Sequence, residues 1–315
     1  MLSSTADHLY WMARSIERAE NTARMLDITY RMSLLKPADG ETFQEWAAVL
    51  SISGLSDEYF ARGTLIDATN VLDFMALDEE NPISIVGSLR AARENARAVR
   101  GTITSELWET INQTWLAMRD VQARGIPADG VSAFFDWVKE RSHLSRGVAH
   151  GTMLRDDAFR FIRLGTFLER ADNTARILDV KYHILLPSLQ EVGGAADYYQ
   201  WSALLRSVSA FEAYRKVFRD VITPRRVANL LILSPDMPRS LRMCLAEVNR
   251  LVQEIGGHKT WELQRRVGLL FADVCYGRIE DIIETGLHEY LTGILERVHA
   301  IGELIDQTYF WPADA

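Results

Sequence analysis

The sequence predicts an all-α fold: a helical bundle built from two tandem repeats related by a pseudo-two-fold axis. Two observations support this prediction. A charged helical segment occurs twice, and long amphipathic patterns alternate with short Pro/Gly breaks, without strand-like alternation of apolar and polar residues. Long helices joined by short breaks are typical of a bundle, and a segment that returns after half the chain indicates duplication.

The repeated segment spans residues 11–30 and 163–182. Its most similar part reads ERAENTAR from Glu17 and ERADNTAR from Glu169, 152 residues further on. Weaker matches follow at separations of 155 or 156 residues: Trp46 with Trp201, Glu106-Leu107 with Glu262-Leu263, and Glu140-Arg141 with Glu296-Arg297. We therefore expect two helical repeats, residues 1–150 and 151–315, packed as one globular unit.

The helices of the first repeat follow from apolar periodicity and its interruptions. Ser3 or Ser4 is expected to cap a first helix that ends before Lys36-Pro37. Further helical or apolar segments are predicted over residues 41–55, 66–77, 82–100, 105–121 and 131–148. In the second repeat, Asp156 or Asp157 is expected to cap the second copy of the opening helix, which ends before Leu186-Pro187.

Helix geometry separates an apolar stripe from a polar line in both copies. At about 100° per residue, one arc collects the apolar residues Met12, Ile16, Ala19, Ala23, Leu26 and Tyr30, and Leu164, Leu168, Ala171, Ala175, Leu178 and Tyr182. The polar line holds Glu17, Asn21 and Arg24 in one copy and Glu169, Asn173 and Arg176 in the other, with Arg18 and Arg170 about a quarter turn away.

Three interpretations of the polar lines remain open from the sequence. They can be a solvated surface with local ion pairs, each contributing a few tenths of a kcal/mol. They can be two clusters aimed at a shared cleft, or buried ion pairs that fix the register of the helices where the repeats join. A solvated surface would not require Asn at the same place in both copies, so it is the least specific of the three explanations.

Composition narrows the classes of function. The formal net charge is −8, which disfavours a nucleic-acid-binding surface as the main role. No stretch of about eighteen apolar residues is present, so we expect no membrane span. Charged residues lie too close to the start of the sequence for a signal peptide. Cys244 and Cys275 lie far apart without CxxC spacing and suit a reducing, cytoplasmic environment. Both are expected to be buried structural thiols.

The repeated ExxH spacing makes a metal site a candidate. Di-iron bundles combine two ExxH pairs with two lone glutamates. The corresponding residues here are Glu140, His143, Glu296 and His299, with Glu106 and Glu262 as the lone glutamates. Pairs at this spacing are common on helix surfaces, and an arginine follows each ExxH glutamate, so surface pairing is favoured and no metal or cofactor is expected.

The residues outside these motifs have simpler explanations. The tryptophans, Trp261 among them, are expected to lie in the core or to line a groove. Arg155 lies in the loop between the repeats and is a candidate for reaching the cleft, although a local ion pair explains it equally well.

The segments LSSTADHLYWMARSIERAENTARMLD and GTMLRDDAFRFIRLGTFLERADNTARILDVKYH, with the closing Tyr309-Phe310, resemble the bacterial alpha-E domain family over essentially the whole chain. The resemblance implies an all-helical fold with characteristic glutamates, which match Glu17 and Glu169. It also implies partners, because such proteins are typically encoded beside or fused to a circularly permuted ATP-grasp protein and a transglutaminase-like protein. No catalytic mechanism is implied for the domain itself.

Two functions follow as hypotheses. In the first, the protein is an accessory component of a peptide or amide ligation system and binds a partner or peptide through Arg18, Asn21, Arg24, Arg170, Asn173 and Arg176. In the second, it is an enzyme on peptide-like amides, with Glu17 or Glu169 as general acid/base and the arginines stabilising an oxyanion. The second requires a concave pocket in which solvent reaches at least one of the two glutamates.

Overall fold

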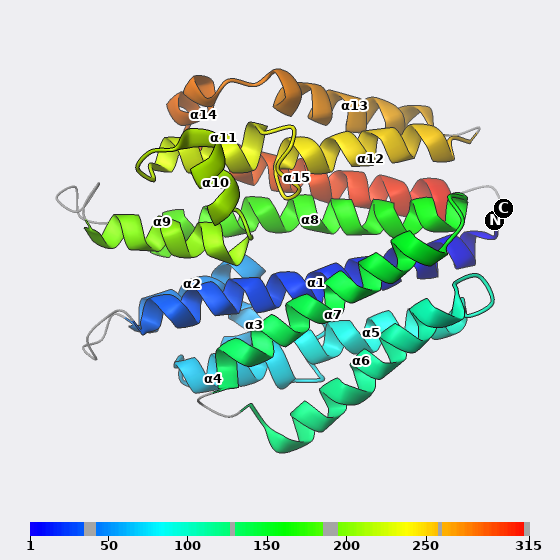
Figure 1. Ribbon diagram of the computed structural model, residues 1–315, viewed down its shortest axis with the longest axis horizontal. Helices are drawn as coiled ribbons and strands as arrows, with labels where there is room; N and C mark the ends of the chain where they lie inside the picture. Colours follow the sequence, from blue (N-terminus) through cyan, green and yellow to red (C-terminus); the bar gives the residue numbers. More distant parts are fainter. Residues whose placement is uncertain (35–41, 127–129, 185–194, 258–259, 312–315) are drawn as a thin grey trace.

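A computed structural model describes residues 1–34, 42–126, 130–184, 195–257 and 260–311. In these regions all regular secondary structure is helical (Figure 1). Within these ranges there are fifteen α-helices and two π-helical turns, and no strand. The all-α prediction is therefore confirmed. None of the helices in these ranges has the length and apolar character needed to cross a bilayer.

Two long helices form the centre of the molecule. α1 (Ser3–Ser33) and α8 (Asp157–Ile184) lie side by side and run in the same direction (Figure 1). They approach most closely where Gly165 faces the carbonyl of Tyr10, because a Cβ atom at position 165 would overlap that oxygen. The predicted apolar stripes are buried in both helices, apart from Tyr30, which is half-buried, and Tyr182, whose side chain is outside the described residues.

The helices that follow α1 cover one side of this pair. They are α2 (Thr42–Ser53), α3 (Ser56–Ala61), α4 (Ala68–Leu72), the π-turn η1 (Asp73–Leu77), α5 (Ile85–Ala98), α6 (Ser105–Arg124) and α7 (Val131–Thr152). α5 and α7 pack directly on α1, and α6 packs on both of them. Side-chain caps mark where two of these helices begin: Ser84 caps α5 and Thr104 caps α6. Helix α6 ends at Gly125, whose φ is 75°.

The helices that follow α8 cover the other side. They are α9 (Ala195–Ser207), α10 (Phe211–Phe218), α11 (Pro224–Leu233), α12 (Leu241–Ile255), α13 (Trp261–Tyr276), α14 (Ile279–Thr285), α15 (Leu287–Ile305) and the π-turn η3 (Asp306–Phe310). α12 and α15 pack on α8, and α13 forms an outer layer over them (Figure 1). The apolar core of this side also takes in residues of α1, such as Leu9 and Met12.

Several predicted boundaries need correction. Neither Ser3 nor Ser4 caps α1: the N-cap is Leu2, whose carbonyl accepts the amides of Thr5 and Ala6, and no side-chain cap bond forms. The apolar segment predicted over 66–77 forms two short pieces, α4 and η1. Asp156 does cap α8, since its carboxylate accepts the Phe159 amide at 3.2 Å. The predicted stops at Lys36-Pro37 and Leu186-Pro187 lie outside the described residues.

Candidate functional site

The repeated polar residues meet between α1 and α8. Arg170 of α8 donates two hydrogen bonds to the carboxylate of Glu17 on α1, at 2.9 and 3.0 Å. Arg18 of α1 donates two to Glu169 on α8, at 2.7 and 3.1 Å. Each Glu-Arg pair therefore exchanges partners with the other copy, and neither pairs within its own helix. Such bidentate pairs fix both distance and orientation.

Three more arginines, one on α1 and two from other parts of the chain, complete these pairs. Glu169 also accepts from Arg14 at 2.7 Å, and Glu17 from Arg146 of α7 at 2.6 Å. Arg239, the residue before the N-cap of α12, lies 3.2 Å from Glu17. We refer to Glu17, Glu20, Glu169, Arg14, Arg18, Arg24, Arg146, Arg170 and Arg239 as the arginine–carboxylate cluster.

Glu20 was not among the predicted site residues, yet it is as central to the cluster as Glu17. Its carboxylate is fully buried and contacts Arg24 at 2.7 Å, Arg146 at 2.6 Å, and Arg239. His143, which is 55% exposed, approaches it to 3.4 Å from the surface. The sequence indicated Glu20 only through the repeated octet, in which the second copy has Asp172 at the corresponding position.

Arg24 and Arg176 hold helices that belong to the other side of the molecule. Arg24 of α1 donates to the carbonyl of Ser207, the last residue of α9, and to Ser209 Oγ at 3.1 Å. Arg176 of α8 donates to the Ile52 carbonyl in the last turn of α2, at 2.6 Å. Carbonyls at helix C-termini lack intrahelical partners, and cations stabilise that end of the helix dipole. Both arginines therefore act as C-terminal caps across the interface.

The two asparagines of the repeat differ in their surroundings. Asn21 donates to the Glu169 backbone carbonyl at 3.4 Å and accepts from Arg239 at 3.3 Å. Asn173 is buried as well, and its Nδ2 has no acceptor among the described residues. The donor to Asn21 Oδ1 also has no matching side chain 156 positions earlier, where Ile83 stands in place of Arg239.

Electrostatics keep the carboxylates ionised despite their burial. Burial alone would raise the pKa of Glu169, but Arg14 and Arg18 outweigh it and lower the pKa to about 2. Burial opposes ionisation of Glu17 and Glu20 too, yet the arginines around them lower both pKa values. Burial lowers the pKa of Arg239 to about 10 in spite of its two carboxylate neighbours. A carboxylate with a lowered pKa is a poor proton donor near neutral pH.

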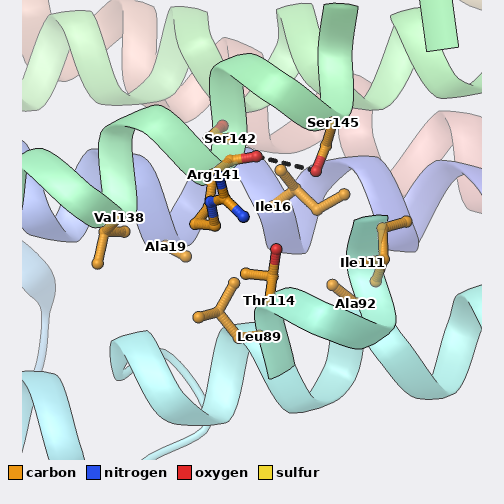
Figure 2. Close-up of a pocket in the computed structure, with 10 residues that line it drawn as sticks. All are labelled: Ile16, Ala19, Leu89, Ala92, Ile111, Thr114, Val138, Arg141, Ser142 and Ser145. Atoms are coloured by element: carbon orange, nitrogen blue, oxygen red, sulfur yellow. Dashed lines mark hydrogen bonds between the residues drawn. The ribbon is translucent and has the colours of Figure 1, made fainter. Parts of the chain in front are cut away.

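Burial also restricts access to the predicted glutamates. Glu17 is 0% exposed and Glu169 is 5% exposed. A cavity of about 20 Å³ is lined by Glu17 and Arg146, and a neighbouring one of about 10 Å³ is lined by Arg141, Ser142, Ser145 and apolar residues of α1, α5 and α6 (Figure 2). Such volumes correspond to about one water molecule rather than a peptide. The solvated-surface interpretation is wrong for five of the six residues of the polar lines, which are buried; the exception is Arg176, whose side chain is 37% exposed.

Apart from His143, which contacts Glu20, the other candidate residues do not contact the arginine–carboxylate cluster in the described part of the chain. Arg155 is exposed, donates to the His150 carbonyl at 2.7 Å and stacks on Phe159 at 4.1 Å. Glu140, Glu296 and His299 are exposed, and His299 pairs with Glu303 at 3.5 Å. In the described part of the chain, no three metal-ligating side chains converge. Cys244 is fully buried as predicted, whereas Cys275 is half-buried.

The comparisons with known proteins agree with the sequence resemblance. Residues 1–310 match the Alpha-E family, described as a predicted alpha-helical domain with a conserved ER motif. Uncharacterized protein Mb2597 of Mycobacterium bovis is 24% identical over 313 residues, and uncharacterized protein Rv2567 of Mycobacterium tuberculosis is 23% identical. The match takes in 93% of this chain but 35% of either relative, so the chain spans about a third of their length. No solved structure matches it.

Proposed function

The chain belongs to the Alpha-E family, and from this premise we propose that it is a cytoplasmic accessory component of an ATP-grasp-linked peptide or amide ligation system. In this proposal it binds a partner protein or peptide and does not itself turn over a substrate. The partners proposed are the circularly permuted ATP-grasp protein and the transglutaminase-like protein implied by the resemblance.

The observation that carries this proposal is that the glutamates of the arginine–carboxylate cluster are bonded to arginines inside the protein. Glu17 and Glu169 are ionised, buried and bonded to at least two arginines each. Hydrogen bonds to charged groups contribute about 1.5–3 kcal/mol each, so a substrate would have to displace several strong bonds to reach either carboxylate. We therefore assign the cluster to holding α1 against α8, and assign binding to the outer surface.

The relatives support an accessory role from a separate direction. The match covers about a third of their length, so in those proteins a domain like this one shares a chain with other segments. Domains that share a chain experience a high effective concentration of one another. A domain that works by holding other components together fits this arrangement.

We further propose that the fold arose by duplication of one helical repeat, with residues 1–150 and 151–315 as its copies. Contacts at matching positions support this. Thr22 donates to the Ile83 carbonyl and Thr174 to the Arg239 carbonyl, and the two acceptors are 156 residues apart. Likewise, Ser84 and Ser240 each donate to a carbonyl six residues earlier and each cap the next helix.

The enzymatic alternative, with Glu17 or Glu169 as general acid/base, lacks a favouring observation among the described residues. It required a glutamate that solvent reaches in a concave pocket, and both carboxylates are engaged inside the protein. We therefore do not propose it.

Co-purification tests the proposed function directly. The tagged full chain is expressed together with a circularly permuted ATP-grasp protein of the kind that the resemblance implies, and the affinity of the purified pair is measured by calorimetry at low and physiological salt. We expect a stoichiometric complex, and no release of product when the chain alone is incubated with peptide amides. Failure of the two to associate at high concentration and low salt would contradict the proposal.

A further inference from the structure

Helix α13 carries a stripe of exposed apolar side chains along the outer layer of the bundle (Figure 1). Trp261 is 71% exposed, Leu269 is 49% exposed and Tyr276 is 84% exposed. On the helix they fall within an arc of about 80°, opposite the buried residues Leu263, Val267, Leu270 and Val274. The sequence had indicated that Trp261 lies in the core or in a groove, and its exposure corrects this.

The fold does not require this stripe. On the duplication proposed above, α6 is the counterpart of α13, with residues 156 positions earlier. The counterparts of Trp261, Leu269 and Tyr276 are Ser105, Gln113 and Asp120, all polar. A helix at the matching place in the bundle therefore stays folded with polar residues at all three of these positions, although it exposes Leu116 on the same face. Large exposed tryptophan and tyrosine residues beside arginines are the side chains that contribute most at protein interfaces.

Charge divides this face into two halves. Arg265 and Arg266 lie near the beginning of α13, beside a groove of about 300 Å³ between α13 and α15. Asp273 lies near its end, and Glu280 and Asp281 follow at the beginning of α14. Both Arg265 and Asp273 are exposed; Arg265 lies on the outer arc of the helix and Asp273 lies about 40° outside it. Each has a partner in its own chain, since Arg265 donates to Glu262 at 2.8 and 2.9 Å and Asp273 lies 2.7 Å from Arg297. A surface with opposite charges at its two ends is complementary to a copy of itself turned through 180°.

We propose that this face binds a second copy of the chain, with the two α13 helices antiparallel about a two-fold axis at Leu269. In this register Leu269 meets Leu269 of the second copy. Arg265 and Asp273 are each four residues from the axis, so each faces the other in the second copy. Trp261 lies eight residues before the axis and meets the region of Tyr276. The apolar residues are buried, and the two new charge pairs replace those that Arg265 makes with Glu262 and Asp273 makes with Arg297 in the single chain.

The length of the stripe sets the strength of the contact. From Trp261 to Tyr276 the helix rises by about 22 Å, so the interface is at the small end of specific protein contacts. The dimer is therefore expected to dissociate within the micromolar range. Its centre is a single leucine, so one charged substitution there removes it.

Sedimentation velocity of the full chain over a wide concentration range tests the proposal. We expect a shift with concentration towards twice the monomer mass of 35.8 kDa. Leu269→Asp should abolish the shift, whereas the matched control Leu116→Asp, at a leucine 51% exposed on α6, should leave it unchanged. Tyr276→Ser, at a side chain outside the core, should weaken association about tenfold or more, and circular dichroism checks that each variant is folded.

Charge reversal tests the register itself. Arg265→Glu and Asp273→Arg each place like charges opposite one another in a homodimer, and each should be monomeric. A mixture of the two variants restores both opposite-charge pairs and should dimerise. Monomers at every concentration, a dimer insensitive to Leu269→Asp, or a mixture that stays monomeric would each overturn the proposal. Binding of the monomer to anionic lipid vesicles through Trp261 would also overturn it, by assigning the face to a membrane.

Discussion

Glu17 and Arg170 form a bidentate ion pair between α1 and α8, at 2.9 and 3.0 Å, and Glu169 and Arg18 form the same pair in the opposite sense. Two such pairs are compatible with only one relative register of the helices. Sliding α8 by one turn, about 5.4 Å, would break both pairs, and three of the four charged groups, Glu17, Glu169 and Arg170, are buried. The repeated Glu-Arg sequence therefore specifies how the two central helices align.

Neutralising Glu17 should destabilise the protein strongly. In Glu17→Gln the shape is kept, but Arg146, Arg170 and Arg239 lose a shared carboxylate inside the protein. Breaking a buried ion pair by removing one partner costs about 3–5 kcal/mol. Urea denaturation should show a loss of this size in the free energy of unfolding. The control is Glu94→Gln at an exposed pair with Arg97, expected to change stability by less than about 0.5 kcal/mol. Equal effects of the two variants would show that the cluster does not hold the helices.

Stability should fall in acid because of the same cluster. Glu169 has a pKa of about 2 in the folded protein against an ordinary 4.5, so its ionised form stabilises the fold above pH 4.5. This contribution is lost as the pH falls from 4.5 through about 2. A difference of this size corresponds to roughly 3 kcal/mol. Glu17 and Glu20, whose pKa values are also lowered, add to the loss in the same direction.

Unfolding free energies measured between pH 7 and pH 2 check this expectation. Glu169→Gln should be less stable than the wild type at pH 7, and the gap should narrow towards pH 2, where Glu169 of the folded wild type is about half protonated. A gap that is independent of pH would mean that the charge of Glu169 contributes nothing.

Arg24 and Arg176 should differ in their effects, although they hold matching places in the repeat. Arg24 is buried, and Arg24→Met should cost about 3–5 kcal/mol. The Arg176 side chain is partly exposed, so Arg176→Met should cost about 1 kcal/mol. Hydrogen exchange gives a sharper test, because loss of a cap frees the end of one helix. Exchange should accelerate at the C-terminus of α9 in the first variant and at the C-terminus of α2 in the second. Acceleration confined to α1 and α8 would argue against the cross-capping role.

The sequence was informative about the cluster wherever the repeat preserved it. The recurrence of Glu17 and Arg18 at 169 and 170 predicted residues that meet, and helix periodicity predicted the buried stripes beside them. It was uninformative about Arg146 and Arg239. The residues 156 positions away are Gly302 and Ile83, so comparison of the copies gave no signal there. Arg239 also reaches Asn21 across 218 residues from outside any helix, and periodicity does not predict contacts of that kind.

The helical wheel separated the polar line of α1 from its buried stripe but left the environment of that line open, for a physical reason. It treated Glu17, Asn21 and Arg24 as a line distinct from the buried stripe, since charged side chains are rarely buried without partners. In the folded protein α1 is enclosed by α5, α7 and α8, so its polar line meets arginines from other helices. A single helix considered alone does not reveal how many neighbours surround it.

The two cysteines should differ in reactivity. Burial raises the pKa of Cys244 to about 12, so almost no thiolate forms at pH 8, and the sulfur is inaccessible. Cys275 is half-buried. With a chromogenic disulfide reagent at pH 8, we expect one thiol to react in the native protein and two in 6 M guanidinium. Cys275→Ser should remove the fast-reacting thiol. Two fast thiols in the native state would show that α12 opens readily from α8.

The crossing of α1 and α8 should be intolerant of one added methyl group. In Gly165→Ala the new Cβ overlaps the Tyr10 carbonyl oxygen, and backbone on a packed helix has little freedom to move aside. Overpacking of this kind costs about 1–3 kcal/mol, and it should also lengthen the Arg14–Glu169 contact one turn away. Gly147→Ala is the matched control, because no atom lies within 4 Å of its added Cβ in α7. Since alanine favours helix over glycine by up to about 1 kcal/mol, this control should be stabilising. The two substitutions are chemically identical, so opposite signs in urea denaturation would isolate the close approach of the helices, whereas stabilisation by both would mean that α1 and α8 are further apart than described.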